Sequence, residues 1–211
     1  YMQYSTFAAI DIGSYDVILE IFEISKKQGI RSVDKICHRM ELGKDTYTLG
    51  KIRPEMEEEL CRVLADFVRI MEGYRVDDYR ATASSAISEA SNSLYVLGKI
   101  HQLTGLSVTV LSNSEQRFLS YKALAAMEDN FNKIIEKGTA ILDLDGGSFQ
   151  ISLFDKDALV TTQNIRMGSL RIRERLAGIQ SETEHYEEMV EELIWNEVSS
   201  FKKDVSERPQ N

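Results

Sequence analysis

One short sequence pattern occurs twice in this chain, and it constrains the fold more than any other feature. The segment Ile10-Asp11-Ile12-Gly13-Ser14 is matched by Leu142-Asp143-Leu144-Asp145-Gly146-Gly147-Ser148. The two central aspartates lie 132 positions apart (143 − 11), and an alternating apolar segment follows each copy. Solenoid repeats have much shorter periods, so an echo of this length indicates two related lobes.

Each copy is typical of an apolar strand that ends in Asp, turns through Gly and Ser, and returns as a second strand. Glycine permits backbone angles that direct successive amide N–H groups into one concavity, and such concavities bind phosphate oxygens. A carboxylate at the end of the strand can hold Mg²⁺ directly or through water. A single copy is more often a plain structural turn, but the pair favours two phosphate loops that face each other across a cleft. The predicted phosphate-binding residues are Gly13, Ser14, Gly146, Gly147 and Ser148, and the predicted Mg²⁺ ligands are Asp11 and Asp143.

Hydrophobic periodicity predicts the elements around these loops. Strands are expected over 7–10, 17–24, 35–42, 80–83 and 106–111, with helices from Pro54, over 86–103 and over 114–126. The order β-β-β-α-β-α-β-α resembles a ribonuclease-H-like half, a mixed sheet flanked by helices. After a join near 129–132, strands are expected over 139–144, 150–154 and 157–165, followed by helices over 170–176 and 186–201. The predicted domains are therefore a first ribonuclease-H-like lobe at 1–134 and a second one that starts at 135 and occupies 135–211.

Four blocks of the sequence resemble motifs of the exopolyphosphatase/guanosine pentaphosphate phosphohydrolase family, in the family's order and spacing. Residues 9–14, Ala-Ile-Asp-Ile-Gly-Ser, resemble its N-terminal Ala-hydrophobic-Asp-hydrophobic-Gly-Ser motif. Residues 83–92 follow its Ala-Thr-Ser-Ala-x-Arg-x-Ala-x-Asn outline, and residues 111–118 resemble its Ile-Ser-Gly-x-Glu-Glu-Ala-Arg-Leu segment. Residues 142–150 resemble its Ile-Asp-x-Gly-Gly-Gly-Ser-Thr-Glu segment, so the resemblance covers roughly residues 4–175.

This resemblance implies an α/β fold of actin-like ATPase type, shared with sugar kinases and Hsp70, in which the second lobe of this chain is incomplete. It implies a Mg²⁺-dependent hydrolase that releases terminal orthophosphate from polyphosphate or guanosine pentaphosphate. Glu115 would be the general base for the attacking water, with Asp143 as the second catalytic residue. Without a one-residue deletion in the alignment, Gln116 takes the position of the base. Glu115 also completes a capping-box pattern with Ser112, so a purely structural cap is the alternative.

Four positions depart from the family pattern. Tyr15 replaces Asn, Ser88 replaces an Arg that would clamp phosphate, and Gln150 replaces a Glu. Asp145 replaces the first of three glycines, where a carboxylate either binds metal or repels phosphate. These departures keep one alternative open, a non-catalytic phosphate or nucleotide sensor of the same fold. A third reading, an actin-like ATP-binding module, stays open because adenosine-side motifs are missing.

Charge and composition limit the classes of partner. The net charge of −9 weighs against binding to duplex nucleic acid, and a polyanionic substrate then needs local cations or amides. The sequence has neither a membrane-spanning apolar run nor a leader pattern, and its two cysteines form no disulfide framework. We therefore expect a cytoplasmic protein without membrane partners, and the family resemblance allows a homodimer. The three histidines lack metal-ligand spacing and are interpreted as structural.

Overall fold

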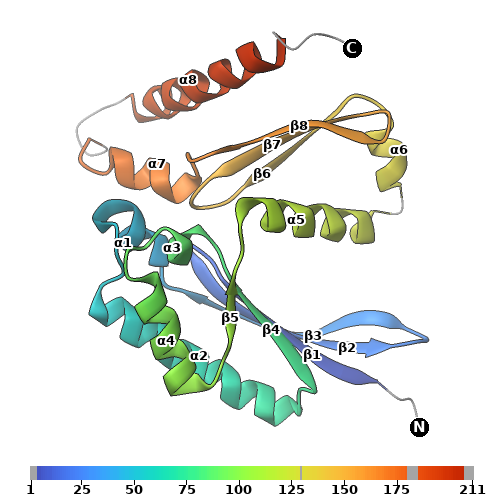
Figure 1. Cartoon of the computed structure of the whole chain (residues 1–211), viewed down its shortest axis with the longest axis vertical. Helices are drawn as coiled ribbons and strands as arrows, with labels where there is room; N and C mark the ends of the chain where they lie inside the picture. Colours follow the sequence, from blue (N-terminus) through green and yellow to red (C-terminus); the bar gives the residue numbers. More distant parts are fainter. Residues whose placement is uncertain (1–3, 129, 180–184, 207–211) are drawn as a thin grey trace. The chain divides into compact units, whose positions relative to one another are not determined.

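The structure is a computed structural model that describes residues 4–128, 130–179 and 185–206 (Figure 1). By its internal contacts the chain divides into two compact units, residues 1–112 and residues 113–211. Each unit is described by itself below.

Unit 1 is built on a five-stranded mixed sheet in the order β3-β2-β1-β4-β5. The strands β1 (Ser5–Ile12), β2 (Asp16–Ser25) and β3 (Gly29–Arg39) form an antiparallel meander, in which Ile12 pairs with Val17 at the first predicted loop. The strands β4 (Asp78–Ala83) and β5 (Val108–Val110) then add in parallel to β1. Parallel neighbours require crossover connections, which the helices supply.

The helices of unit 1 cover the sheet with their apolar sides. Helix α2 (Pro54–Tyr74) begins with Pro at its first position, and its buried Leu60, Leu64 and Phe67 follow the period of a helix. Helix α4 (Ser93–Thr104) packs beside α2 (Figure 1) and buries Val96 and Ile100. Together with the inward side chains of β1 and β2, these residues form one core.

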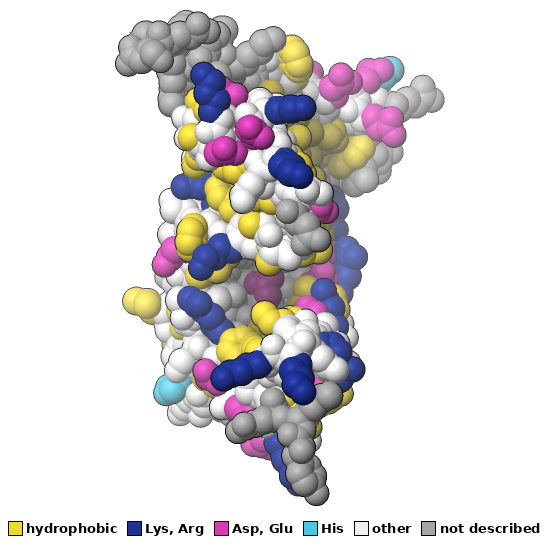
Figure 2. All heavy atoms as spheres, turned by 90° about the vertical axis from the view of Figure 1, so that its right-hand side faces the viewer, with side chains coloured by type: hydrophobic (Ala, Val, Ile, Leu, Met, Phe, Trp, Pro, Cys, Tyr) yellow, Lys and Arg dark blue, Asp and Glu magenta, His cyan; other side chains and the backbone are white. Residues whose placement is uncertain are grey.

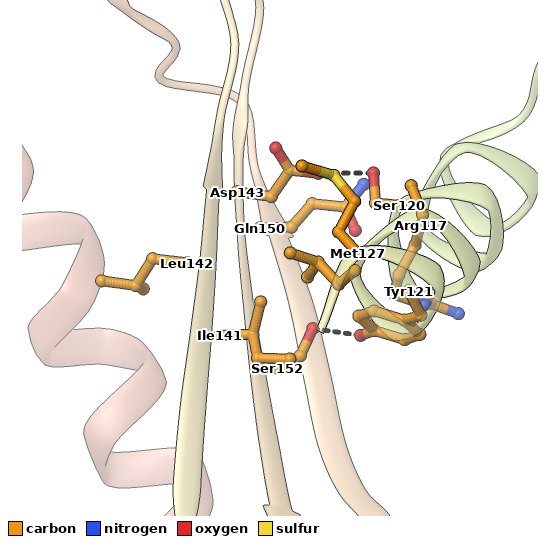
Figure 3. A pocket seen from close by; sticks show the side chains of 11 residues that line it. Arg117, Ser120, Tyr121, Met127, Ile141, Leu142, Asp143, Gln150 and Ser152 are labelled. Carbon is orange, nitrogen blue, oxygen red and sulfur yellow. Dashed lines mark hydrogen bonds between the residues drawn. The ribbon is translucent and has the colours of Figure 1, made fainter. Parts of the chain in front are cut away.

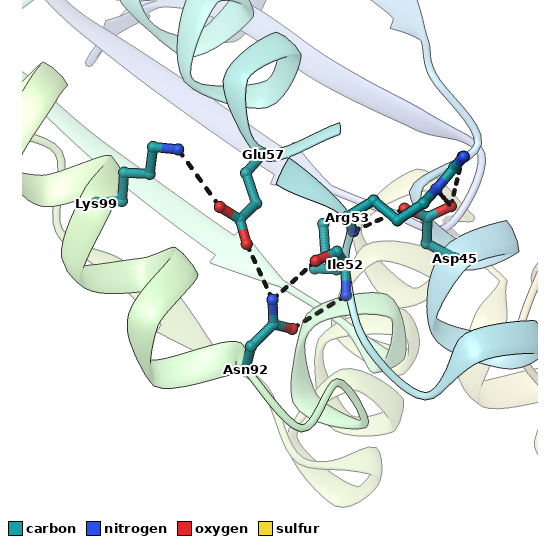
Figure 4. Close-up of polar contacts among 6 residues, drawn as sticks. All are labelled: Asp45, Ile52, Arg53, Glu57, Asn92 and Lys99. Atoms are coloured by element: carbon teal, nitrogen blue, oxygen red, sulfur yellow. Dashed lines mark hydrogen bonds and ion pairs between the residues drawn. The ribbon is translucent and has the colours of Figure 1, made fainter. Parts of the chain in front are cut away.

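A buried polar network joins these helices to the segment that precedes α2 (Figure 4). The amide of Asn92 donates to Ile52 O at 2.8 Å and to Glu57 Oε1 at 2.9 Å, and its oxygen accepts from Ile52 N at 3.0 Å. Lys99 Nζ lies 3.4 Å from Glu57 Oε2. Desolvation lowers the pKa of Lys99, but the hydrogen bond and the charge of Glu57 together raise this pKa by more than desolvation lowers it. The net shift is therefore upward. The Asn at the end of the 83–92 motif therefore has a structural role, because it satisfies a buried carboxylate and a loop backbone.

The structure corrects the predicted helices of unit 1 at two points. The helix expected over 86–103 is divided into α3 (Ser85–Ser88) and α4, because the intervening turn is tied elsewhere: Ser91 N donates to Gly50 O at 2.9 Å. Helix α1 (Leu42–Leu49) was not predicted, since it buries polar Asp45 and Thr46 where a periodic stripe would be apolar. Asp45, which is 1% exposed, accepts hydrogen bonds from the backbone N and Nε of Arg53, both at 2.9 Å (Figure 4).

The strand boundaries in unit 1 also differ from the prediction. Strand β3 begins at Gly29 and not near residue 35, because the whole of β2 finds a partner on it. Strand β5 is limited to three residues, which pair with Ala81, Thr82 and Ala83.

Unit 2 is an antiparallel three-stranded meander with helices on both faces. The strands are β6 (Thr139–Leu144), β7 (Phe149–Asp155) and β8 (Ala158–Ile165), in the order β6-β7-β8. The helix α5 (Asn113–Met127) contacts one face, since Tyr121 bonds to Ser152 and packs edge-on against Phe154. The helices α7 (Ser169–Leu176) and α8 (Tyr186–Ser206) cover the opposite face around buried Ile151.

The compact units divide between Ser112 and Asn113, whereas the predicted domains divide after residue 134. The reason is α5, whose side chains bond to β6 and β7 and which therefore belongs to unit 2. The predicted join at 129–132 contains the short helix α6 (Phe131–Ile135), and residue 129 lies outside the described residues.

No helix in the described ranges is both long and apolar enough to cross a membrane. Figure 2 shows one face of the molecule, on which Lys and Arg side chains are interspersed with acidic, apolar and neutral ones.

Candidate functional site

The first predicted phosphate loop connects β1 to β2 in unit 1 and is closed by its own backbone. Gly13 N donates to Asp16 O at 2.9 Å, and a Cβ on Gly13 would lie 3.1 Å from that oxygen. The loop therefore uses the small size of glycine to turn tightly, and it uses the Gly13 amide inside the turn. Asp11 is exposed on β1, opposite Ile18 and Thr82.

The hydroxyl of Ser14 is held by a chain of hydroxyl groups. Ser14 is 6% exposed, and its Oγ lies 2.6 Å from Tyr47 Oη, which lies 2.7 Å from Ser85 Oγ. Ser14 O accepts from Gly43 N at 2.9 Å, which joins the loop to α1. Tyr47 was not predicted as part of the site, because nothing in the sequence marks α1 as adjacent to the loop.

The departures in unit 1 lie around this loop. The backbone O of Tyr15 accepts hydrogen bonds from Met40 N and Glu41 N, and the Arg39 guanidinium lies 5.5 Å from the centre of the Tyr15 ring. Ser88 is exposed at the end of α3. Of these contacts, only the one between the Tyr15 ring and Arg39 depends on the side chain, and an Asn would not make it.

The second predicted phosphate loop connects β6 to β7 in unit 2, and the side chain of Asp145 organises it. Asp145 Oδ1 accepts hydrogen bonds from both Gly147 N and Ser148 N, each at 2.7 Å. Asp145 N donates to Ser148 O at 3.0 Å, and Gln116 Nε2 donates to Asp145 Oδ2 at 3.3 Å. Two of the amides predicted to bind phosphate therefore bind a carboxylate of the same chain.

The backbone carbonyl oxygens of the second loop accept hydrogen bonds from the start of α7. Ser169 N donates to Asp145 O, and Leu170 N and Arg171 N both donate to Gly146 O, all at 3.0 Å. Arg171 Nε donates to Gly147 O at 2.8 Å. The first amides of α7 are thus satisfied by the loop, which supplies the cap that a helix start needs.

Gly168 makes this close approach of α7 to the loop possible. A Cβ at Gly168 would lie 2.4 Å from Gly146 C and from Ser148 N, and 2.5 Å from Gly146 O. No side chain fits at such distances from backbone atoms. Sequence reasoning did not single out Gly168; its signal was a glycine between a predicted strand and a predicted helix.

A cavity of about 270 Å³ lies between α5 and the sheet of unit 2 (Figure 3). Its polar side chains include Asp143, Gln150, Ser120, Ser152 and Arg117, and its walls include Tyr121, Met127 and Ile141. Asp143 and Gln150 are cross-strand partners on β6 and β7, and their side chains point toward α5, whereas Leu142 points to the opposite face (Figure 3).

Hydrogen bonds orient both polar groups of this strand pair. Ser120 Oγ donates to Asp143 Oδ2 at 2.9 Å. Gln150 Nε2 donates to Asn113 O at 3.3 Å, whereas its buried Oε1 has no partner within the described part of the chain. A buried acceptor of this kind is uncommon, because leaving it unpaired carries a desolvation cost. Ser120 was missed at the sequence level, since a lone Ser on a predicted helix has no distinguishing pattern.

Glu115 and Gln116 begin α5 but face different surroundings. Glu115 is exposed in the first turn of the helix, whereas Gln116 points at the second loop through its bond to Asp145. The structure thus brings Gln116, Asp143, Asp145 and Gln150 to one end of the β6–β7 hairpin. The role of Glu115 as general base stays a prediction.

The side chains around Asp143 fit a Mg²⁺ site in which the protein supplies only one or two of the ligands. The described residues contain no group of three or more His, Cys, Asp or Glu placed to hold a metal ion. Mg²⁺ is commonly held by one or two carboxylates together with waters and substrate phosphates. Asp143, with Oδ2 oriented by Ser120, fits such a site through its other oxygen. Asp11, the other predicted ligand, lies in unit 1.

Comparison with known proteins gives the context for these loops. The model of the Ppx/GppA phosphatase family matches residues 20–210. The chain belongs to this family. The matched range includes the second loop, at residues 145–148, and begins after the first loop.

Individual relatives are distant. A bifunctional 3-dehydroquinate synthase/phosphatase of Fusobacterium nucleatum is 22% identical over 174 residues, 80% of this chain and 26% of that protein. Exopolyphosphatase 1 of Mycobacterium leprae is 25% identical over 144 residues, 68% of this chain and 41% of the relative. The crystal structure of a Ppx/GppA family member from Aquifex aeolicus matches with a TM-score of 0.70 at 23% identity and covers 94% of this chain and 63% of its own.

These likenesses confirm the predicted fold class, α/β with ribonuclease-H-like, actin-like ATPase sheets flanked by helices. The chain spans about a quarter to two fifths of the length of these two curated relatives.

Proposed function

We propose that this chain takes part in phosphoanhydride hydrolysis, releasing terminal orthophosphate from polyphosphate or from a phosphorylated guanosine nucleotide such as guanosine pentaphosphate. The observation that carries the proposal is the pairing of Asp143 with a phosphate-type loop at one end of the β6–β7 hairpin, in a chain of the Ppx/GppA family. The similarity to exopolyphosphatase 1 of M. leprae supports the choice of polyphosphate.

In this proposal the residues have the following roles. Asp143, oriented by Ser120, would hold Mg²⁺, which would supply positive charge to neutralise the phosphoryl oxygens. Glu115 takes a proton from the attacking water as the water oxygen bonds to the terminal phosphorus, and the bond between that phosphorus and the bridging oxygen breaks. The shortened chain leaves with the electron pair of that bond.

The amides of the second loop and local cations bind the rest of the polyanion. A net charge of −9 opposes long-range attraction of polyphosphate, so binding depends on groups close to the loops. Arg117 on α5 lines the cavity beside Asp143 and Gln150, where a guanidinium can offset the charge of an incoming phosphate (Figure 3).

Release of phosphate from long-chain polyphosphate with Mg²⁺ tests this function. Glu115→Gln is expected to lower the rate by about 10²- to 10⁴-fold, the usual contribution of a general base. The matched control is Glu128→Gln, an exposed residue just beyond the other end of α5. If the wild type and Glu115→Gln release phosphate at equal rates while Asp143→Asn is inactive, Glu115 is not the general base.

A second candidate is a sensor that binds phosphate chains without cleaving them. Its specific support is chemical: the side chains that meet at the second loop include the neutral amides of Gln116 and Gln150, and Asp145 bonds to the loop amides. Calorimetry with polyphosphate separates the two candidates. Tight binding without phosphate release by the wild type favours the sensor.

A further inference from the structure

Asp145 occupies the position that a bound anion would take in the second loop. Its Oδ1 lies 2.7 Å from both Gly147 N and Ser148 N, which is the range of a short charge-assisted hydrogen bond. Converging amides of this kind form an anion-binding concavity. Here a carboxylate oxygen fills that concavity.

The remaining contacts of the loop hold Asp145 in place. Gln116 Nε2 donates to its second oxygen at 3.3 Å, and its backbone N and O bond to Ser148 O and Ser169 N. On the far side of the loop the backbone carbonyls are taken by α7 and by Arg171 Nε. The amides of Gly147 and Ser148 are therefore the groups that an external anion would seek, and both are engaged.

We propose that Asp145 is a specificity-determining residue, an internal competitor that keeps free orthophosphate off the amides of Gly147 and Ser148. A phosphate oxygen reaches these amides only when the carboxylate withdraws, and the two anions exclude each other because like charges at that distance repel. A small phosphate with no other contacts is thus rejected. A phosphate chain with contacts elsewhere on the protein can displace Asp145. This inference rests on the proposed phosphate chemistry of the loop.

Removal of the carboxylate is expected to open the loop to phosphate. In Asp145→Ala, orthophosphate should bind at least about tenfold more tightly than in the wild type, the factor that one charge-assisted hydrogen bond represents. Alanine is tolerated by the backbone, because Asp145 is not among the described residues with positive φ. Asp145→Asn should fall between the two, since its amide oxygen still accepts hydrogen bonds but carries no charge.

The test is a titration of the full chain with orthophosphate at constant ionic strength, followed by NMR of the Gly147 and Ser148 amides. In Asp145→Ala these two resonances should shift and saturate at concentrations that leave the wild type unmoved. Asp155→Ala is the control for net charge, because it removes one carboxylate from the exposed far end of β7. Should Asp145→Ala lose the loop resonances altogether, Asp145→Asn decides, since its side chain can still order the loop.

Equal midpoints for the wild type and the Asp145 variants would overturn the inference, as would the absence of any shift at Gly147 and Ser148 in the variants. The titration needs no turnover, so it is separate from the proposed hydrolysis. A chain that releases no phosphate but gains phosphate binding in Asp145→Ala would contradict the hydrolase proposal alone.

Discussion

Gly168→Ala is expected to destabilise unit 2, although it changes none of the side chains of the candidate site. The new Cβ would lie 2.4–2.5 Å from three backbone atoms of Gly146 and Ser148, so either α7 or the second loop has to move. Overpacking of this kind typically costs about 1–3 kcal/mol. The loop also loses good geometry in the bonds from Ser169 N and Arg171 N that fix its carbonyls.

Urea unfolding followed by tryptophan fluorescence measures this cost in unit 2, because Trp195 in α8 is the only tryptophan in the sequence. A loss of about 1–3 kcal/mol corresponds to a fall in the thermal midpoint on the order of 10 °C for a domain of this size. The matched control is Gly178→Ala, where an added Cβ meets nothing within 4 Å. That change should leave stability equal or raise it by about 0.4–1 kcal/mol. Equal urea midpoints for Gly168→Ala and the wild type would refute the close-approach argument.

Three further predictions concern the buried polar groups and the thiols. Asn92→Ala should destabilise unit 1 by about 2–3 kcal/mol in urea unfolding, because it removes three hydrogen bonds, one of them to the buried carboxylate of Glu57 that also pairs with Lys99. An unchanged urea midpoint would contradict this role of Asn92. Gln150→Glu should tighten Mg²⁺ binding in calorimetry, since it places a second carboxylate opposite Asp143. It should also lower stability, because the hydrogen bond to Asn113 O is lost. Weaker Mg²⁺ binding would count against a metal at this pair of residues. Cys61 is buried on α2, whereas Cys37 is exposed. A thiol reagent should therefore label Cys37 in the native chain and Cys61 only on unfolding, and equal labelling rates would contradict the packing of α2.

The parts of the fold that follow from side-chain periodicity could be predicted. The apolar positions of α2 repeat at the helical period because one side of the helix faces the sheet, and the alternation of β2 reflects its inward Val17, Leu19 and Ile21. Helix α1 could not be found in this way, since its buried face is held by Asp45 and Thr46 through hydrogen bonds.

The candidate site was predictable in its location and not in its internal bonding. The echo around Asp11 and Asp143 marked both loops, and in the first of them Gly13 turns tightly against Asp16 O. The sequence left open whether Asp145 serves metal or repels phosphate, since its choice of the Gly147 and Ser148 amides depends on how the loop folds. Tyr47 and Gly168 were missed because they come from segments distant in sequence that meet the loops only in three dimensions.

The most direct test of the proposed hydrolysis is ³¹P NMR of polyphosphate incubated with the full chain and Mg²⁺ in ¹⁸O-labelled water. Attack of water on the terminal phosphorus predicts orthophosphate that carries one ¹⁸O, formed by the wild type and by the control Asp155→Asn, but reduced to background by Asp143→Asn. Release of labelled orthophosphate by Asp143→Asn at the wild-type rate would contradict the placement of the chemistry at the β6–β7 hairpin. Absence of labelled orthophosphate from the wild type would contradict hydrolysis by this chain.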